Sequence, residues 1–161
     1  MSQIDVEHMI KEVPSSPKGR LIWTALVDVG ERVDLGAVPG GRRFMVPILG
    51  GRVVSGPGIK GLDGIVLAGG ADRQLLRADG VKELDALYEI KTDDGQIITI
   101  RNRVIVDDGE KLERYAMSVI DTTVPDGQLS WLNRRLLVGT LQSLRPERSV
   151  VIVRAWEMNV G

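Results

Sequence analysis

The stretch GGADRQLLRADGVKELDALYEIKTDDG, from Gly69 to Gly95, predicts the fold class of this chain. Apolar and polar side chains alternate along it with a period of two, which is typical of a β-strand with one buried face. Two Asp-Gly pairs, Asp79-Gly80 and Asp94-Gly95, bracket its second half. Asp-Gly is favoured in two-residue hairpin turns, where both central residues have positive φ. The stretch therefore predicts antiparallel strands joined by short hairpins.

The same period of two continues on both sides of this stretch. We expect strands near residues 21–29, 44–48, 61–68, 72–78, 82–92, 96–106, 112–123, 129–138 and 149–158. Asp108-Gly109 and Asp126-Gly127 add two further turns, and eight glycines between residues 50 and 70 indicate sharp coiling or close backbone approach. A long sheet with short connections closes on itself because closure removes its edges. We predict an all-β protein with one closed antiparallel, lipocalin-like β-barrel, and a β-sandwich is the alternative.

Residues 1–19 differ from the rest of the chain. A few apolar residues are spaced as on one face of a short helix, and Pro14 and Pro17 then end it. We expect an N-terminal arm over residues 1–19, followed by a β-barrel domain over residues 20–161.

Composition excludes several classes of function. The net charge of −1 gives no overall field for nucleic acid or an anionic membrane surface. The absence of cysteine excludes disulfides and thiolate metal sites. The sequence contains no apolar run of about 18 residues that would suit a membrane-spanning helix. We therefore expect a cytoplasmic protein without a nucleic-acid or membrane partner.

Motifs for common catalytic sites are weak. The letters G-x-G-x-x-G occur at residues 56–61, but Pro57 removes an amide and no helix follows. The single histidine, His8, lies in the predicted arm, which argues against a Ser-His-Asp triad or a zinc site. Asp93, Asp94, Asp107 and Asp108 could bind calcium or magnesium through their carboxylates, but aspartate is favoured at turns in any case by its backbone hydrogen bonds. We expect no metal and no cofactor.

Strand parity places single polar groups among apolar neighbours. A buried carboxylate must be paired or remain protonated, and either state suits a general acid or base. Asp72 and Asp85 are the candidate catalytic residues. The candidate substrate-binding residues are Gln74, Tyr88, Asn102, Trp131 and Asn133. The alternative for Asp72 and Asp85 is a structural role in which they cap turns or bind backbone amides at the barrel ends.

The order of several segments resembles the domain of unknown function 3237 family of small bacterial and fungal proteins. The matching segments are GRRFMVPILGG, SGPGIKG, LAGGADRQLLRADG, LDALYEIKTDDG, IRN and LSWLNRRLLVG, which together span about residues 41–139. The resemblance implies a lipocalin-like barrel with an interior cavity for a small molecule, no organic cofactor and assembly as a homo-oligomer. Arg73 stands where the family usually has an aromatic residue, which implies a different pocket rim.

Two functions follow from this sequence. The first is a cofactor-independent isomerase, cyclase or hydratase/lyase that transfers protons on a small oxygenated molecule inside the barrel. The second is a non-catalytic carrier or sensor of a hydrophobic small molecule. A purely structural role would require a fully packed interior.

Overall fold

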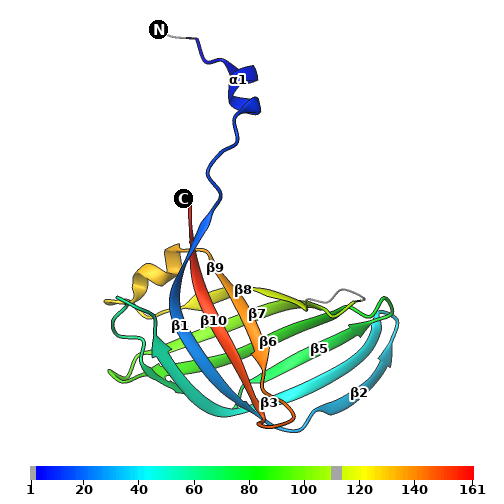
Figure 1. Ribbon diagram of the computed structural model, residues 1–161. Helices are drawn as coiled ribbons and strands as arrows, with labels where there is room; N and C mark the ends of the chain where they lie inside the picture. Colours follow the sequence, from blue (N-terminus) through cyan, green and yellow to red (C-terminus); the bar gives the residue numbers. More distant parts are fainter. Residues whose placement is uncertain (1–2, 110–113) are drawn as a thin grey trace.

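The protein is described by a computed structural model that covers residues 3–109 and 114–161 (Figure 1). Its elements in chain order are α1 (Val6–Lys11), β1 (Lys18–Val29), β2 (Val33–Val38), β3 (Gly41–Ser55), β4 (Gly64–Val66), β5 (Ala71–Arg77), β6 (Lys82–Thr92), β7 (Ile97–Asp107), β8 (Tyr115–Thr123), the 3-10 helix η1 (Ser130–Arg134), β9 (Leu137–Ser143) and β10 (Val150–Asn159).

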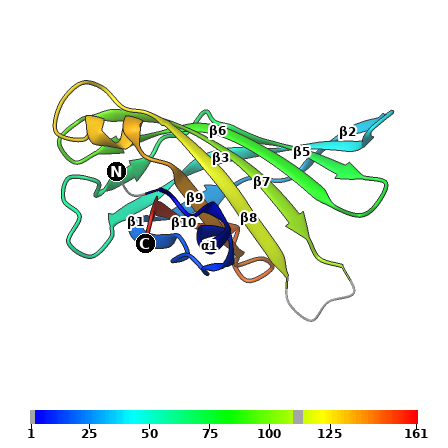
Figure 2. The same cartoon turned by 90° about the horizontal axis from the view of Figure 1, so that it is seen from above.

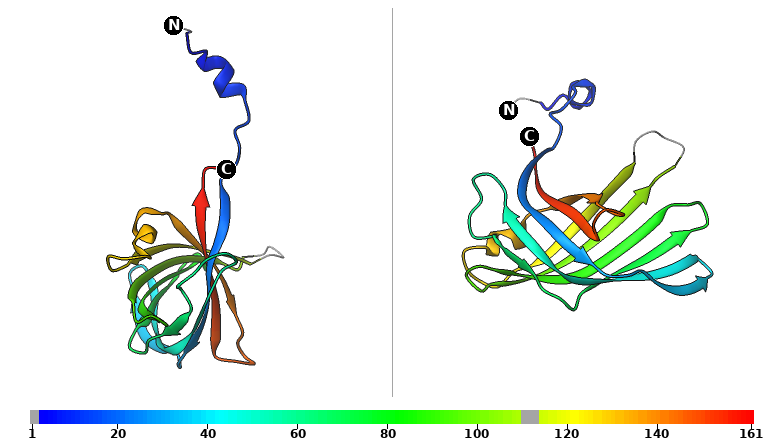
Figure 3. Two further views of the ribbon diagram at one scale, coloured as in Figure 1. Left: turned by 90° about the vertical axis from the view of Figure 1, so that its left-hand side faces the viewer. Right: turned by 60° about the horizontal axis from the view of Figure 1, so that its bottom comes forward.

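The strands form one antiparallel sheet that closes into an eight-strand barrel, which confirms the predicted fold class. The order around the ring is β1, β10, β9, β8, β7 and β6, then β4 and β5 in one shared position, and then β3. Pairing of residues 23–29 of β1 with residues 48–55 of β3 closes the ring. Figure 3 (left) shows the strands curving around into this ring. Because the edges pair with each other, the sheet is a barrel and not a sandwich.

The sheet extends beyond the ring at one end. β2 pairs with the first part of β3, and β5 pairs with the same part of β3 on its other side. Seen from above, the β2–β3 and β5–β6 hairpins extend to the same side of the barrel (Figure 2). We call this end of the barrel the mouth. The strands β1, β5, β7 and β9 run toward it, so the connections that follow these strands lie there.

Asp79-Gly80 and Asp94-Gly95 lie in hairpins, but the predicted turn type is wrong, and Asp126-Gly127 lies between β8 and η1 instead of in a hairpin. No residue other than glycine has positive φ in the described ranges, whereas Gly80 and Gly95 have φ of 87° and 88°. The amide of Gly80 donates to the carbonyl of Arg77 at 3.0 Å, and Gly95 donates to Thr92 at 2.8 Å. Each loop therefore has three residues, with a turn followed by a left-handed glycine, and the aspartate keeps an ordinary backbone conformation.

Two predicted strand positions need correction. The segment predicted as a strand at 129–138 contains η1, and the strand β9 begins only at Leu137. β2 was not predicted, because VDLGAV has weak alternation and a glycine at its centre. The first two residues of the strand predicted at 112–123 lie outside the described residues.

Glycines allow the closest approach between strands, as their density predicted. A Cβ atom at Gly51 would lie 2.0 Å from the carbonyl oxygen of Leu26. At Gly70 it would lie 2.5 Å from the Cβ atom of Tyr88. Both distances are far below van der Waals contact, so these positions accept no side chain without movement of the neighbouring strand.

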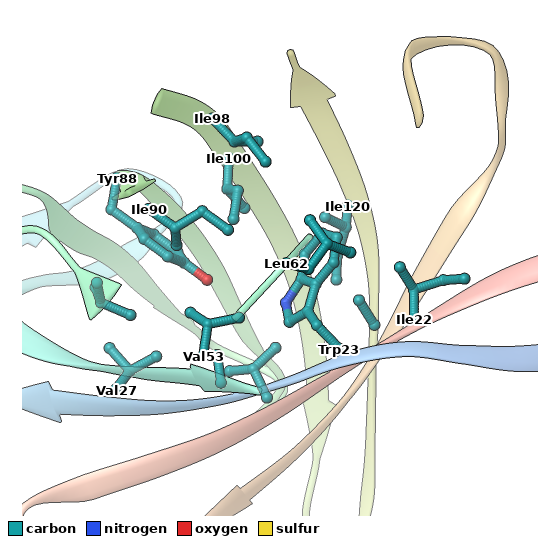
Figure 4. Close-up of a cluster of buried hydrophobic side chains, with 14 of the residues drawn as sticks. Ile22, Trp23, Val27, Val53, Leu62, Tyr88, Ile90, Ile98, Ile100 and Ile120 are labelled. Carbon is teal, nitrogen blue, oxygen red and sulfur yellow. The ribbon is translucent and has the colours of Figure 1, made fainter. Parts of the chain in front are cut away.

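The end of the barrel opposite the mouth is filled by an apolar core. Trp23 and Leu62 have no exposed surface there, and Leu132 of η1 is 1% exposed. Figure 4 shows Trp23 and Leu62 packed beside Val53 and Ile120. This packing closes one end, which we call the closed end.

The N-terminal segment extends away from the barrel (Figure 1). α1 has no buried residue, and Asp5 caps it by accepting a hydrogen bond from the His8 amide at 3.1 Å. β1 begins at Lys18, and residues 1–2 of the predicted arm lie outside the described part of the chain. Neither α1 nor η1 has the length and apolar character that a membrane-crossing helix requires.

Candidate functional site

A cavity opens at the mouth of the barrel and continues toward its centre. Its outer part has a volume of about 460 Å³ and its inner part about 50 Å³. The residues that line both parts are Val29, Asp72, Leu84, Leu141 and Val151. The combined volume of the two parts lies within the range of pockets that hold small organic molecules. The interior is therefore not fully packed at this end.

Asp72 lies on the cavity wall. Strand parity placed it among apolar neighbours, and the family resemblance implied the cavity. In β5 it pairs with Val46 of β3 and Ala86 of β6, so its side chain points to the inside of the barrel. Its Oδ2 atom accepts a hydrogen bond from Nε2 of Gln74 at 2.8 Å. Its Oδ1 atom is buried without a hydrogen-bond partner in the described residues.

The environment of Asp72 favours its neutral form. Burial raises the pKa of Asp72, and the hydrogen bond from Gln74 and the backbone amide of Asp85 oppose this effect. Gln74 itself lines the outer part of the cavity. The two residues therefore form one hydrogen-bonded polar unit on the cavity wall.

Tyr88 and Asn102 line the inner part of the cavity together with Asp72. Tyr88 is 3% exposed, and Figure 4 shows its hydroxyl directed toward the barrel interior. Burial raises the pKa of Tyr88, so its phenol stays neutral and can donate a hydrogen bond. Asn102 is buried, and its Oδ1 atom has no partner within the described ranges. Two unpaired polar atoms, on Asp72 and Asn102, thus belong to one cavity.

Asp85 is placed differently from the prediction. It is the neighbour of Arg73 across β5 and β6, and both lie on the outer face of the barrel. Two hydrogen bonds from Arg101, of 3.1 and 2.9 Å, hold its carboxylate. The hydrogen bond from Arg101 lowers the pKa of Asp85 despite partial desolvation. Asp85 therefore does not share the cavity with Asp72, and Arg73 does not form its rim.

Trp131 and Asn133 also lie away from the cavity, in η1 at the closed end. Asn133 accepts a hydrogen bond from the amide of Val124 and donates one to its carbonyl, both at 2.9 Å. Trp131 packs against the apolar core, and the guanidinium of Arg20 lies 5.9 Å from its ring centroid. Their positions do not support the predicted ligand contacts, because η1 joins β8 to β9 at the end of the barrel opposite the mouth.

A set of basic residues at the mouth was not predicted from the sequence. The four cationic side chains that line the outer part of the cavity are Arg32, Lys82, Arg114 and Arg145. Each comes from a different connection or strand end, so no two are neighbours in the sequence. The signal that could have revealed them is that alternate connections of an antiparallel barrel lie at the same end.

A larger hollow of about 680 Å³ lies on the outer face of the same strands. It is open to solvent and is lined by charged residues that include Arg43, Asp85 and Arg103. Asp85 is already paired with Arg101, and Arg103 pairs with Asp121 at 3.2 Å. We therefore place the candidate site in the enclosed cavity, where polar atoms remain unpaired.

Acidic and histidine side chains do not gather into a metal site within residues 3–109 and 114–161. No group of three or more histidine, aspartate or glutamate side chains in these ranges could hold a metal ion. Asp108, one of the turn residues considered from the sequence, pairs with Nε of Arg114 at 2.9 Å.

Comparison with known sequences identifies relatives of this chain. The family model described as "Protein of unknown function (DUF3237)" matches residues 17–158. UPF0311 protein RPA1785 of Rhodopseudomonas palustris is 35% identical over 83 residues, which cover 52% of this chain and 52% of that protein. The chain thus aligns with about half the length of this curated relative.

Solved structures extend the likeness over most of the chain. The conserved protein of unknown function RPA1785 from Rhodopseudomonas palustris superposes with a TM-score of 0.79 at 26% identity, covering 90% of this chain and 99% of that one. A protein of unknown function from Clostridium acetobutylicum gives 0.78 at 25% identity, with 89% and 100% covered. An enzyme from Penicillium herquei shares the fold, with a TM-score of 0.71 at 22% identity and 92% and 98% covered. Because the family model covers nearly the whole barrel, this chain belongs to the DUF3237 family of proteins of unknown function.

Proposed function

We propose that this protein binds a small oxygenated organic molecule in the barrel cavity and that Asp72 transfers a proton to or from it. The observation that carries the proposal is the buried Oδ1 atom of Asp72, which has no partner in the described residues although it lines a cavity. A buried polar atom without a partner costs free energy, so a role in stability does not account for it.

The neighbours of Asp72 support proton transfer to an oxygenated compound. The phenol of Tyr88 and the amide of Asn102 line the same inner cavity and can hold a carbonyl or hydroxyl oxygen. A carboxyl group whose pKa is raised by burial holds its proton more readily and can act as a general acid as well as a base. Such a reaction is an isomerisation, a cyclisation, or an addition or elimination of water. The shared fold of the Penicillium herquei enzyme supports an enzymatic role only at the level of the barrel.

Hydrogen–deuterium exchange tests the proposal with a panel of model compounds. Small ketones, enones and hydroxy acids are first screened for binding by ligand-observed NMR. Compounds that bind are then incubated with the protein in D₂O, and deuterium incorporation at their acidic C–H positions is followed by NMR. We expect wild type to catalyse exchange and Asp72→Asn to slow it by about 100-fold or more.

Asp85→Asn is the matched control, because it makes the same change of side chain on the outer face. It should bind and exchange like wild type. Binding without exchange by wild type would reject proton transfer and favour the carrier. Equal exchange by Asp72→Asn would reject the role of Asp72.

A further inference from the structure

We propose that the cavity selects small organic anions, in which one carboxylate or similar oxyanion is attached to an apolar body. The basic residues at the mouth hold the anionic group, and the apolar walls hold the body. This inference rests on the proposed function, because it names the ligand class of the same cavity.

The residues that line the outer part of the cavity carry an excess of positive charge. Four cationic side chains line it, and Asp72 is the one carboxyl group among the lining residues in the described ranges. Arg114 is paired with Asp108. Arg32, Lys82 and Arg145 make no ion pair with a carboxylate of residues 3–109 or 114–161. Three of the four cations that line the outer cavity therefore have no carboxylate partner among the described residues.

Two of these cations are held in place by contacts that leave their charge uncompensated. Nη2 of Arg145 donates to the backbone carbonyl of Gly30 at 2.7 Å. The guanidinium of Arg32 lies over the ring of Phe44, 4.0 Å from its centroid. Each guanidinium has five N–H donors, so most remain available to a carboxylate or a sulfonate. A cation that is already positioned loses less conformational entropy when it binds an anion.

Asp34 does not neutralise this group. It accepts three hydrogen bonds from Arg42, at 2.6, 3.0 and 3.1 Å, and does not line the cavity. Arg32 acts on Asp34 only as a distant charge that helps to lower its pKa. The partner of Asp34 is therefore Arg42.

The volume and the apolar walls of the cavity indicate the size and the apolar character of the ligand body. The volume of about 460 Å³ lies behind a mouth where basic residues gather, and its walls include Val46, Val106 and Val151. The chain as a whole has a net charge of −1, so the excess of positive charge is local. A cavity with apolar walls and basic residues at its entrance suits a small amphiphilic anion. A polyanion needs an extended basic surface instead.

Binding of 1-anilinonaphthalene-8-sulfonate, an aromatic anion that fluoresces in apolar sites, provides the test. Competition is measured with 2-naphthoate, with the neutral 2-naphthamide and with inorganic phosphate. We expect 2-naphthoate to displace the dye at concentrations about tenfold or more below the amide, because a hydrogen bond to a charged group is stronger than one to a neutral group. Inorganic phosphate should compete weakly, because it has no apolar body, and added salt should weaken binding.

Variants that remove one positive charge each show which side chains contact the anionic group of the ligand. Lys82→Gln and Arg145→Gln should each weaken dye and naphthoate binding by about tenfold and leave amide binding unchanged. The double variant Arg52→Gln/Lys91→Gln removes two cations that do not line the cavity and should bind as wild type does. Lys82→Gln is the safer variant, because Arg145 also contacts the backbone; circular dichroism confirms that each variant is folded.

Three results would overturn the inference: no dye binding, equal affinity for the acid and the amide, or no effect of Lys82→Gln and Arg145→Gln. If the amide binds as tightly as the acid and Asp72→Asn still abolishes deuterium exchange, the selectivity for anions fails and the proposed function stands. If the acid is selected but wild type catalyses no exchange, the anion site stands and the proposed proton transfer fails.

Discussion

Gln74 donates a hydrogen bond to Oδ2 of Asp72 at 2.8 Å, while Oδ1 of the same carboxyl group is buried without a partner in the described residues. Both side chains come from the inner face of β5, two residues apart. Gln74 therefore orients the carboxyl group and satisfies one of its oxygens. The other oxygen is the one that we propose contacts a ligand.

The raised pKa of Asp72 predicts a pH-dependent cost to stability. In the unfolded chain this group ionises near its usual value of 3.8, whereas burial keeps it protonated to higher pH in the folded barrel. The free energy of unfolding of wild type should therefore fall relative to that of Asp72→Asn as pH rises from about 3.8 through the raised pKa. Each unit of pKa elevation corresponds to about 1.4 kcal/mol. Urea unfolding of both proteins at pH 3 and pH 7 measures the change, and an equal difference at both values would contradict it.

Asp85 should show the opposite dependence on pH. The hydrogen bond from Arg101 lowers the pKa of Asp85, so the ion pair stabilises the fold above about pH 3.8 and is lost as pH falls through the lowered value. Because both side chains are about half exposed, Asp85→Asn should cost less than about 1 kcal/mol at pH 7. Thermal unfolding at low and high salt checks this value. A loss of several kcal/mol would show that the pair is more than a surface contact.

Asn133→Ala should destabilise the closed end without affecting the cavity. The side chain makes two hydrogen bonds of 2.9 Å with the backbone of Val124, which is 5% exposed. Loss of both partners should reduce the free energy of unfolding by about 1–3 kcal/mol. Asn133→Asp keeps the acceptor for the Val124 amide but sets a carboxylate oxygen against the Val124 carbonyl oxygen, so it should also lose stability at neutral pH. Binding of the naphthalene dye should be unchanged in both, and weaker binding would return Asn133 to the candidate ligand contacts.

Gly51→Ala tests the close approach of β1 and β3. The added methyl group would lie 2.0 Å from the carbonyl oxygen of Leu26, so the strands must separate where they close the barrel. We expect a loss of about 3 kcal/mol or more, as for other severe steric conflicts. Gly58→Ala is the control, because Gly58 also has positive φ but nothing within 4 Å of its Cβ position. It should cost about 1 kcal/mol, since only backbone strain is added. Equal unfolding midpoints for the two variants would rule out the steric explanation.

Most of the barrel could be predicted from residue patterns. The period of two identified the strands from β5 to β7, because one face of each strand packs inside and the other meets solvent. Parity also identified Asp72, Gln74 and Asn102 as polar residues that share a strand face with apolar neighbours, and the structure places them, with Tyr88, on the cavity wall. The segment at 129–138 was misassigned because Trp131 and Leu132 resemble strand residues in type, although they occupy a single helical turn.

The inside and outside of each strand could not be assigned from alternation alone. Asp85 and Tyr88 have opposite parity on β6, and their pairing with β5 and β7 puts Tyr88 inside and Asp85 beside Arg101. The basic mouth was equally hidden, because Arg32 and Arg145 are more than a hundred positions apart in the sequence. Closure of the sheet brings their connections to one opening.

Local alternation and turn residues thus account for the strands, the hairpins and the positions where a polar residue stands among apolar ones, since these depend on neighbours along the chain. Strand register and ring closure decide which end is filled by apolar side chains, which end is open, and which basic residues line the cavity. Both depend on contacts between distant residues, such as the pairing of β1 with β3, which no local pattern encodes.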